Sequence, residues 1–365
     1  MESRRLIFSM LAFVIIGVAF GCAPPAPTSP PETKPGLNLI IAADGEVLLK
    51  RDSWTEFHPT SFGAMLYRGD QLQPAADANV VVLCENLTTW TVPSGSPSGL
   101  NNGCPQVPEP ALVSPGGLIA NTRGGTDPLI PYLISPRATK LLDPMPTLRW
   151  NAVPGASTYT LRISGIDWQE QTDATEFKYP GNPALQPGTD YLLIIEADNG
   201  KSSKDEGLPG LGFSLLPEPE ADRVRADATR IDELNLSEAA RGFALAQLYF
   251  GHHLYAEAIE LLEESAVTND QVTNVYRALG ELYQQVGLLM QAELRYLHAV
   301  ESAEAVGDVE SATAAKASLG EVYLALGNKN EARDWLTQAQ SGYETLGDLK
   351  SANQIAEQLQ DLGKQ

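Results

Sequence analysis

Histidine and cysteine are the side chains that most readily ligate metals or act as bases and nucleophiles, and this chain uses both sparingly. Its 365 residues contain four histidines and three cysteines. His58, His252, His253 and His298 have no partner at the spacing of a metal site or a catalytic triad. Neighbouring histidines such as His252 and His253 are more often solvated turn residues than ligands. The sequence therefore predicts no metal-binding residue and no catalytic histidine.

Glycine-rich loops can cradle phosphates or present a nucleophilic serine, and the chain has two such segments. Residues 207–212 (GLPGLG) lack the spacing and the strand-to-helix context of a dinucleotide-binding loop. In residues 95–99 (GSPSG), Pro97 stands where a nucleophile elbow requires serine. The many carboxylates carry no weight without a cleft to hold a pair of them. We therefore expect no enzymatic activity and no cofactor.

Among the elements of the chain, the first is an N-terminal segment with the pattern of an export signal. Basic residues 4–5 precede an apolar stretch over 6–20, which is short for a membrane span of about 20 residues and suits a signal peptide. The stretch ends in AFGC at residues 19–22, which resembles the lipobox of bacterial lipoproteins. The resemblance implies a signal peptide over residues 1–21, cleavage before Cys22 and a diacylglycerol on the Cys22 sulfur. A plain signal peptide and an uncleaved anchor are the alternatives.

Residues 22–36 form a proline-rich segment that follows the expected anchor. Six of these fifteen residues are proline, a composition that favours an extended polyproline II tether. Such a tether would lift the following domains clear of the lipid headgroups. We therefore expect a lipid-anchored, extracytoplasmic protein of the cell envelope, and Ala23 after the cysteine favours the outer membrane over the inner one.

The remaining cysteines, Cys84 and Cys104, lie 20 residues apart on either side of a segment rich in proline, glycine and asparagine. Disulfides persist in oxidising, extracytoplasmic compartments. Closing this loop would contribute about 3 kcal/mol in the chain-entropy model. We expect a disulfide between them, and two free thiols are the alternative.

The charge of the chain limits its partners. A net charge of −21 argues against nucleic acid, because phosphate binding requires clustered Lys and Arg. Residues 221–365 contain 23 acidic and 11 basic residues, a net −12, so the acidity is spread along the chain. This distribution of charge indicates a surface that keeps the protein soluble through self-repulsion. A preference for basic partners is the alternative with a functional meaning.

Residues 37–110 have the pattern of short strands separated by turns. Residues 45–49 (GEVLL) alternate in polarity, residues 68–70 form a turn and residues 79–84 (NVVVLC) form an apolar run. This order resembles the FecR-like β domain of periplasmic signalling and cell-envelope proteins. The central part of the resemblance lies in Leu66, Gly69, Asp70 and Leu72.

A second β module is expected over residues 138–216, after a loop-rich linker over 111–137. Residues 146–163 resemble strands B and C of fibronectin type III domains, and residues 185–197 resemble the passage from strand E to strand F. On these strands, Trp150 and Tyr191 would fill the space between two sheets with a polar atom near an edge. Trp168 has no clear strand assignment, so it is the aromatic residue better placed to contact a ligand.

Residues 217–365 change to a helical pattern in which apolar residues recur with a period of 3.6. A spacing of large and small residues recurs three times, which resembles the tetratricopeptide repeat, a pair of antiparallel helices. The copies contain Leu245, Ala246, Tyr249, Ala258 and Leu262; Tyr276, Leu279, Gly280, Tyr283, Ala292, Tyr296 and Ala299; and Leu319, Gly320, Tyr323, Ala332, Leu336 and Ala339.

Small residues at fixed positions of each copy imply close helix packing. Gly280 and Gly320 would let the first helix of a repeat approach the second. Residues 349–362 would form a capping helix, which a repeat stack needs at its end, and residues 222–234 a helix that leads into the stack. The sequence thus predicts a multidomain chain: two small all-β modules followed by an all-α tetratricopeptide-repeat solenoid.

In tetratricopeptide stacks the first helix of each repeat lines an inner groove in which partner peptides lie. The resemblance places ten residues there: Phe243, Gln247, Phe250, Asn274, Arg277, Glu281, Gln284, Gln285, Glu321 and Leu324. They imply binding of a segment of another protein. The alternative is that the face serves only self-association or packing onto the chain's own β modules.

The sequence therefore favours a non-enzymatic, membrane-anchored adaptor that binds protein partners in the cell envelope. One alternative is a FecR-like sensing and signalling ectodomain. Another is an envelope polysaccharide-binding protein, which would require exposed aromatic residues on a sheet.

Overall fold

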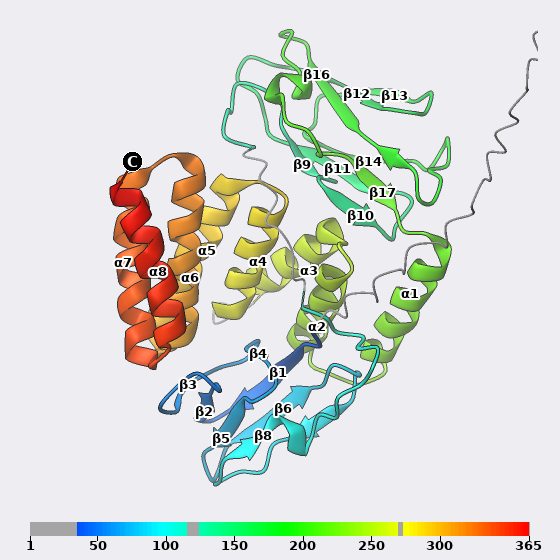
Figure 1. Ribbon diagram of the computed structural model, residues 1–365. Helices are drawn as coiled ribbons and strands as arrows, with labels where there is room; N and C mark the ends of the chain where they lie inside the picture. The colour runs from blue at the N-terminus through cyan, green and yellow to red at the C-terminus, as the bar shows by residue number, and fades with distance from the viewer. Residues whose placement is uncertain (1–34, 115–123, 269–272, 365) are drawn as a thin grey trace, which may run out of the picture. The chain divides into compact units, whose positions relative to one another are not determined.

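The structure, a computed structural model, describes residues 35–114, 124–268 and 273–364. These residues form β-strands up to Leu215 and α-helices from Glu218 onward, so the expected fold class of small β modules followed by an all-α stack is confirmed (Figure 1). The segment that carries Cys22 and the expected signal peptide and tether lies outside the described residues, apart from the last two residues of the tether.

The first β module consists of two four-stranded sheets, with the strand orders β4-β1-β6-β7 and β3-β2-β5-β8. Its strands are β1 (Asn38–Asp44), β2 (Val47–Lys50), β3 (His58–Pro59), β4 (Met65–Leu66), β5 (Gln71–Pro74), β6 (Asn79–Leu83), β7 (Thr89–Thr91) and β8 (Ser98–Gly99). Alternate residues such as Ile40 on β1 and Val80 and Val82 on β6 fill the core of this module. Successive side chains of a strand point to opposite faces, so the residues between them face outward from this core.

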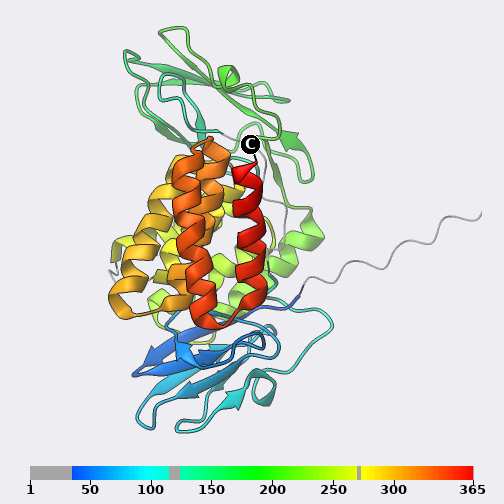
Figure 2. The same cartoon turned by 60° about the vertical axis from the view of Figure 1, so that its left-hand side comes forward.

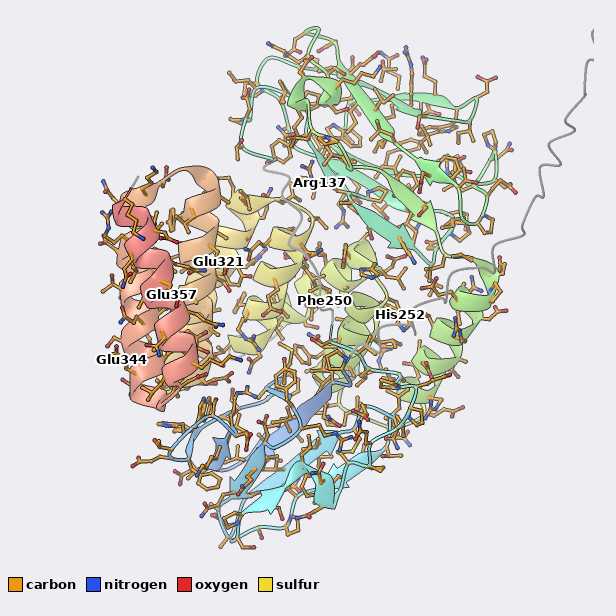
Figure 3. The ribbon with its side chains drawn as sticks, in the orientation of Figure 1. Arg137, Phe250, His252, Glu321, Glu344 and Glu357 are labelled. Carbon is orange, nitrogen blue, oxygen red and sulfur yellow. A yellow bond between two sulfur atoms is a disulfide. The ribbon has the colours of Figure 1, made fainter. Side chains whose placement is uncertain are left out.

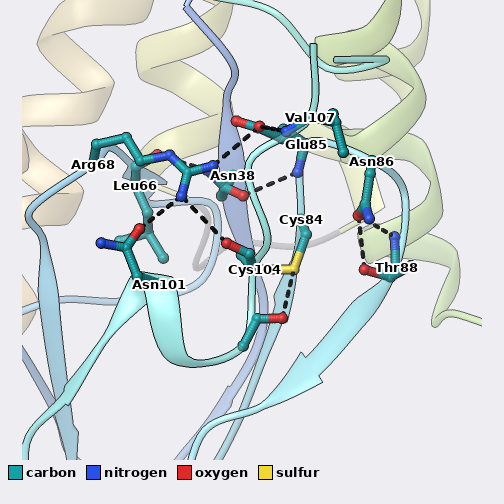
Figure 4. Close-up of a disulfide and its surroundings, with 11 residues drawn as sticks. Asn38, Leu66, Arg68, Cys84, Glu85, Asn86, Thr88, Asn101, Cys104 and Val107 are labelled. Carbon is teal, nitrogen blue, oxygen red and sulfur yellow. Dashed lines mark hydrogen bonds and ion pairs between the residues drawn. A yellow bond between two sulfur atoms is a disulfide. The ribbon is translucent and has the colours of Figure 1, made fainter. Parts of the chain in front are cut away.

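A disulfide joins Cys84, directly after β6, to Cys104. Both cysteines are fully buried, and Arg68 lies beside them (Figure 4). The Arg68 guanidinium donates to the Glu85 carboxylate at 3.1 Å, and the same carboxylate accepts the Val107 backbone N–H at 2.9 Å. These contacts hold the loop that the disulfide closes.

The second β module has three short sheets, with the orders β14-β11-β9, β13-β12-β16 and β10-β17-β15. Its strands are β9 (Leu133–Ser135), β10 (Thr139–Leu141), β11 (Thr147–Trp150), β12 (Tyr159–Ile163), β13 (Gln169–Thr172), β14 (Glu176–Lys178), β15 (Asp190–Tyr191), β16 (Leu193–Ala197) and β17 (Phe213–Leu215). The expected start at residue 138 is too late, because β9 pairs with β11 from within the segment expected to be a linker.

Trp150 and Tyr191 are both core residues of the second module, as expected. The Tyr191 hydroxyl accepts the backbone N–H of Gln186 at 2.8 Å, so its polar atom has a partner five residues upstream. The Trp150 indole differs from the expectation, because its Nε1 is buried without an acceptor among the described residues.

The helical region consists of a leading helix, three hairpins and a final helix. Its helices are α1 (Glu218–Asp232), α2 (Glu238–Gly251), α3 (Tyr255–Thr268), α4 (Thr273–Gln285), α5 (Leu289–Val306), α6 (Val309–Leu326), α7 (Lys329–Leu346) and α8 (Leu349–Gly363). The hairpins are α2–α3, α4–α5 and α6–α7, and α8 packs against α7. Figure 2 shows α7 and α8 side by side.

Small residues allow the helices of a hairpin to approach closely, as predicted. A Cβ atom on Gly280 would lie 2.6 Å from the Tyr296 ring, and one on Gly320 would lie 2.5 Å from the Leu336 side chain. The turns before α6 and α8 combine a left-handed glycine, such as Gly307, with an aspartate that caps the next helix. Asp308 does so by accepting the Ser311 backbone N–H at 3.0 Å.

The first β module shares a hydrophobic core with the helices. On β1, Leu39 and Ile41 point away from the interior of the module and pack in one cluster with residues of α2 such as Phe243 and Leu248. β1 is therefore buried on both faces. From the other direction, Leu346 at the end of α7 belongs to the core of the β module.

Candidate functional site

The ten predicted groove residues lie on the first helices of the three hairpins, α2, α4 and α6. This arrangement agrees with the expected repeat architecture. However, six of the ten are buried: Phe243, Gln247, Phe250, Asn274, Arg277 and Gln284. The face is therefore largely covered, and the contacts of each residue identify what covers it.

The three predicted residues on α2 are core residues, so their prediction as a binding groove is wrong. The Phe243 ring lies 5.6 Å from the ring of Phe62, which precedes β4 of the first β module. Phe250 packs edge-on against Tyr255 at 5.8 Å. Gln247 is 1% exposed, and its Oε1 has no hydrogen-bond partner among the described residues. The α2 face is thus closed to a peptide.

Asn274, at the start of α4, binds the first β module directly. Its Nδ2 donates to the Phe62 carbonyl at 2.8 Å. Its Oδ1 accepts the Ser311 hydroxyl at 3.3 Å, which links α4 to the start of α6. The Ser61 hydroxyl in turn donates to Asp308 at 3.2 Å. The β-module loop therefore occupies the place that the prediction gave to a partner segment.

Arg277 is also buried, at 9% exposure, and it pairs with Glu281 one turn further along α4 at 2.9 Å. Burial opposes its charge, but Glu281 and Glu310 outweigh that effect and raise the pKa of Arg277. Burial raises the pKa of Glu281 even though Arg277 works in the opposite direction. Arg277 is thus an internal cation and not a contact for a partner.

A second ion pair, next to the Arg277–Glu281 pair, joins the first β module to α6. Arg51 donates to Asp70 at 2.8 Å within the module and to Glu310 on α6 at 2.7 Å. Burial opposes the ionisation of Glu310, but Arg51 and Arg277 outweigh it and lower the pKa of this carboxyl. Burial raises the pKa of Asp70 to about 6, against the pull of Arg51. The pair fixes the module against the third hairpin.

The side chains of Gln284 and Leu324 contact other helices of the stack. The Gln284 Oε1 accepts the Tyr296 hydroxyl at 2.8 Å. Leu324 is partly buried and packs against the cluster of Leu336, Ile355 and Leu362, so the final helix α8 covers part of it. Gln284 is therefore closed to a peptide, whereas Leu324 keeps part of its side chain at the surface.

Glu281, Gln285, Glu321 and Leu324 are the predicted groove residues that remain partly exposed. Glu321 lies on α6 (Figure 3). Burial raises the pKa of Glu321, and a hydrogen bond from Gln284 offsets part of the rise. No ion pair to Glu321 exists among the described residues. This carboxylate is the member of the predicted set that still lacks a cationic partner.

The second β module contacts the other ends of the same helices, through residues that the sequence did not single out. Arg137, fully buried, donates to the Val286 carbonyl just beyond α4 at 2.9 Å and pairs with Glu206 at 3.0 Å. The Thr139 hydroxyl accepts the Tyr255 backbone N–H at 2.9 Å and so caps the start of α3. The contacts with Val286 and Tyr255 join residues more than 100 positions apart, and no local pattern indicates them.

The side chains of His298, His253 and Trp168 each lie against aromatic residues. His298 stacks on Tyr276 at 5.3 Å, and the His253 ring lies 2.6 Å from the Tyr255 hydroxyl. Trp168 packs edge-on against Tyr179 at 5.1 Å and beside Phe177 at 6.0 Å. It is a partly buried residue at the edge of the module's core, so its expected role as an exposed ligand contact is not supported.

The described residues contain no group of three or more His, Cys, Asp or Glu side chains arranged to hold a metal ion. Within the same residues, no helix is both long enough and apolar enough to cross a bilayer.

Comparison with known proteins finds no matching family model and no matching curated protein. Among solved structures, the chain is similar to MamA, with 17% identity, 40% of this chain and 90% of MamA covered, and a TM-score of 0.29. It is also similar to the kinesin light chain TPR-like repeats of Podosopora anserina, with 21% identity, 40% and 82% coverage, and a TM-score of 0.32. For BtubC from P. vanneervenii the values are 16% identity, 39% and 71% coverage, and a TM-score of 0.29.

Proposed function

We propose that this protein is a non-enzymatic adaptor of the cell envelope that binds a basic segment of another protein. The binding face lies on the exposed part of α4 and α6, at Glu281, Gln285 and Glu321. The observation that carries the proposal is the Glu321 carboxylate. It is partly buried, its pKa is raised by burial, and no cation pairs with it among the described residues.

The chemistry of this face favours a cationic partner. A carboxylate that has already lost part of its hydration gains more from an incoming Lys or Arg than a fully solvated one does. The net −12 of residues 221–365 adds a longer-range attraction for a basic segment. Steering of this kind raises the association rate and weakens with salt.

Lipidation of Cys22 and an extracytoplasmic location complete the proposal. Their support is the lipobox-like sequence, together with the disulfide between Cys84 and Cys104, a bond that persists in oxidising compartments. The FecR-like and fibronectin type III-like assignments are part of the same proposal. Strand pairing supports the second of these, because β9, β11 and β14 form one sheet and β12, β13 and β16 another. We propose the outer membrane as the site of anchoring.

Photocrosslinking in cells tests the proposed face. A photoreactive amino acid replaces Gln285 in the full-length chain, and Thr337, which is exposed on α7, provides the control position. We expect one protein to be captured from position 285 and not from position 337. Glu321→Arg should abolish the crosslink from position 285, because a partner cation would then meet a like charge.

Substitutions at Arg277 and Gln284 are unsuitable for this purpose, because both side chains are buried and would disturb the fold. A crosslink that survives Glu321→Arg, or that forms equally from position 337, would refute the binding face. As a separate test, we expect Cys22→Ala to release the protein from membranes. Unchanged membrane association of this variant would contradict the proposed lipid anchor.

A further inference from the structure

A cavity of about 110 Å³ lies at the junction of the second β module with α3 and α4. Its walls come from β9, β10, β11 and β14 on one side and from the helices on the other. Apolar cavities of about 150 Å³ hold a molecule the size of benzene, so this one has room for a small organic group. It is separate from the face proposed above for protein partners.

One carboxylate on the cavity wall is incompletely satisfied. Glu257, in the first turn of α3, accepts the Leu142 backbone N–H on its Oε1 at 2.7 Å. Its Oε2 is buried and has no hydrogen-bond partner among the described residues. A buried acceptor of this kind costs free energy unless a donor reaches it. Burial also raises the pKa of Glu257 to about 7, because the loss of hydration destabilises the charged form of the carboxyl.

The cations around the cavity are already neutralised. Arg137 pairs with Glu206 at 3.0 Å. Arg149 pairs with Glu176 at 2.7 Å and Lys178 with Asp143 at 3.0 Å. Glu257 and Glu260, which lie one turn apart on α3, have no ion pair within the described part of the chain. The remaining charge of the wall is therefore negative.

The rest of the wall combines apolar side chains with the polar side chains of Ser135, Thr147 and Tyr283. Ile134, Leu141, Pro146, Ile259 and Val286 line the cavity. Apolar side chains beside a carboxylate oxygen that lacks a donor suit a ligand that has an aliphatic stem and one cationic hydrogen-bond donor. A carboxylic acid or a phosphate would meet Glu257 with like charge, and a plain alkane would leave Oε2 without a donor.

We propose that this cavity binds a primary alkylammonium group, with the ammonium donating to Glu257 Oε2 and the alkyl stem against the apolar side chains of the wall. The group belongs to a small free amine or to a lysine side chain. Both sources present the same ammonium on a flexible aliphatic chain. Binding supplies the missing donor and the missing counter-charge together.

The test uses the full chain and n-butylammonium as the probe, with n-butanol as the uncharged analogue of similar size. Calorimetry and thermal unfolding measure binding. We expect n-butylammonium to bind and to raise the unfolding temperature, and n-butanol to bind about tenfold more weakly or worse. Glu257→Gln should remove the preference for the amine, whereas Glu357→Gln, at an exposed position on α8, should preserve it.

An NMR titration keeps the test decisive if Glu257→Gln does not fold. In the unmodified chain, n-butylammonium should lower the pKa of the Glu257 carboxyl, and n-butanol should leave it unchanged. Acetyl-Gly-Lys-Gly-amide and its Nε-acetylated form distinguish the sources: binding by the unacetylated peptide identifies a lysine side chain, and binding by the free amine alone identifies a small molecule. Equal binding of amine and alcohol, or binding of neither, would overturn the proposal.

Discussion

Single glycines set the closest helix contacts of the stack, and Gly280 offers a direct measurement. Alanine normally favours a helix over glycine by about 1 kcal/mol. At position 280, however, the added Cβ would lie 2.6 Å from the fully buried Tyr296 ring. We expect Gly280→Ala to destabilise the protein by about 1–3 kcal/mol through overpacking, as measured by urea unfolding.

Gly363, at the end of α8, is the matched control. A Cβ there would meet no atom within 4 Å, so Gly363→Ala should change the free energy of unfolding by less than about 0.5 kcal/mol. Equal effects of the two substitutions would show that helix propensity, and not the Tyr296 contact, determines the result.

The buried carboxyls make stability depend on pH in a direction opposite to that of most surface carboxylates. The pKa of Glu257 is about 7 in the folded chain, above its ordinary 4.5. Its contribution is therefore fully present below pH 4.5 and is lost as the pH rises through about 7. Asp70, with a pKa of about 6, acts in the same direction. We expect the unfolding temperature of the unliganded protein to fall from pH about 5 to about 8.

In the Glu257→Gln variant the unfolding temperature should fall less over this pH range, because the contribution of Glu257 to the free energy of unfolding, on the order of 3 kcal/mol at most, is absent. The titration of Asp70 should still cause a smaller fall in the variant. Glu357→Gln serves as the control because Glu357 is exposed. The explanation fails if the pH dependence of the Glu257→Gln variant is as steep as that of the unmodified chain.

At the scale of single elements, the start of α3 depends on a residue from another domain. Tyr255 and Ala256 donate their backbone N–H groups to the Thr139 hydroxyl at 2.9 and 3.3 Å. Thr139→Val keeps the shape of the side chain and removes the acceptor. We expect a loss of about 1–2 kcal/mol in the free energy of unfolding, together with faster amide exchange at Tyr255 and Ala256.

Thr337→Val is the control for this substitution, because the exposed Thr337 hydroxyl donates to the Arg333 carbonyl within its own helix. Its effect should be within about 0.5 kcal/mol. Unchanged exchange at Tyr255 in Thr139→Val would mean that the helix start is held by other contacts.

The elements themselves could be predicted from the sequence to a large extent. The leading helix, the three hairpins and the final helix follow from the period of 3.6 and from Gly280 and Gly320. β9 was missed because Leu133–Ser135 is three residues long and lies among turn residues. A strand of this length carries too few side chains to show an alternating pattern.

The candidate site was predicted less well, because a sequence shows which residues are apolar but not which partner covers them. Two signals could have been used. β1 and β6 carry consecutive apolar residues such as Leu39, Ile40 and Ile41, which indicates burial on both faces. α2 is apolar all round, which indicates a helix inside a core. Together they predict that a β module packs on α2. The polar contacts of Asn274 depend on distant residues and have no such signal.

For the whole molecule, the ion pair between Arg51 and Glu310 tests how firmly the first β module is attached. The two side chains are 16% and 14% exposed. Glu310→Gln leaves Asp70 as the ion-pair partner of the partly buried Arg51, so the loss should be that of one charged hydrogen bond, about 1.5–3 kcal/mol. Glu176→Gln breaks the exposed pair with Arg149 and should cost at most about 1 kcal/mol. Chemical unfolding measures both, and similar losses would mean that burial of the first pair is unimportant.

The shared core predicts cooperative unfolding of the chain. Because Leu39 and Phe243 belong to one cluster, the first β module and the first hairpin should unfold in a single transition. In a variant that keeps Trp54 and Trp90 of the first β module, with Trp150, Trp168 and Trp335 replaced by phenylalanine, tryptophan fluorescence and far-ultraviolet dichroism of the helices should give the same midpoint. Residues 217–365 alone should expose Phe243 and self-associate, as seen by light scattering. Separate midpoints would contradict the shared core.

The attachment of β modules to both ends of the helical hairpins has a mechanical consequence. Stacks of helical hairpins usually behave as springs, since each unit contacts only its neighbours and small rotations add along the stack. Here Asn274 ties the start of α4 to one module, and the Val286 carbonyl beyond its end is held by Arg137 of the other. The second hairpin cannot twist without straining a bond at one end. Leu346 likewise ties the end of α7 to the first module, so stretching of the stack under load must begin at α8.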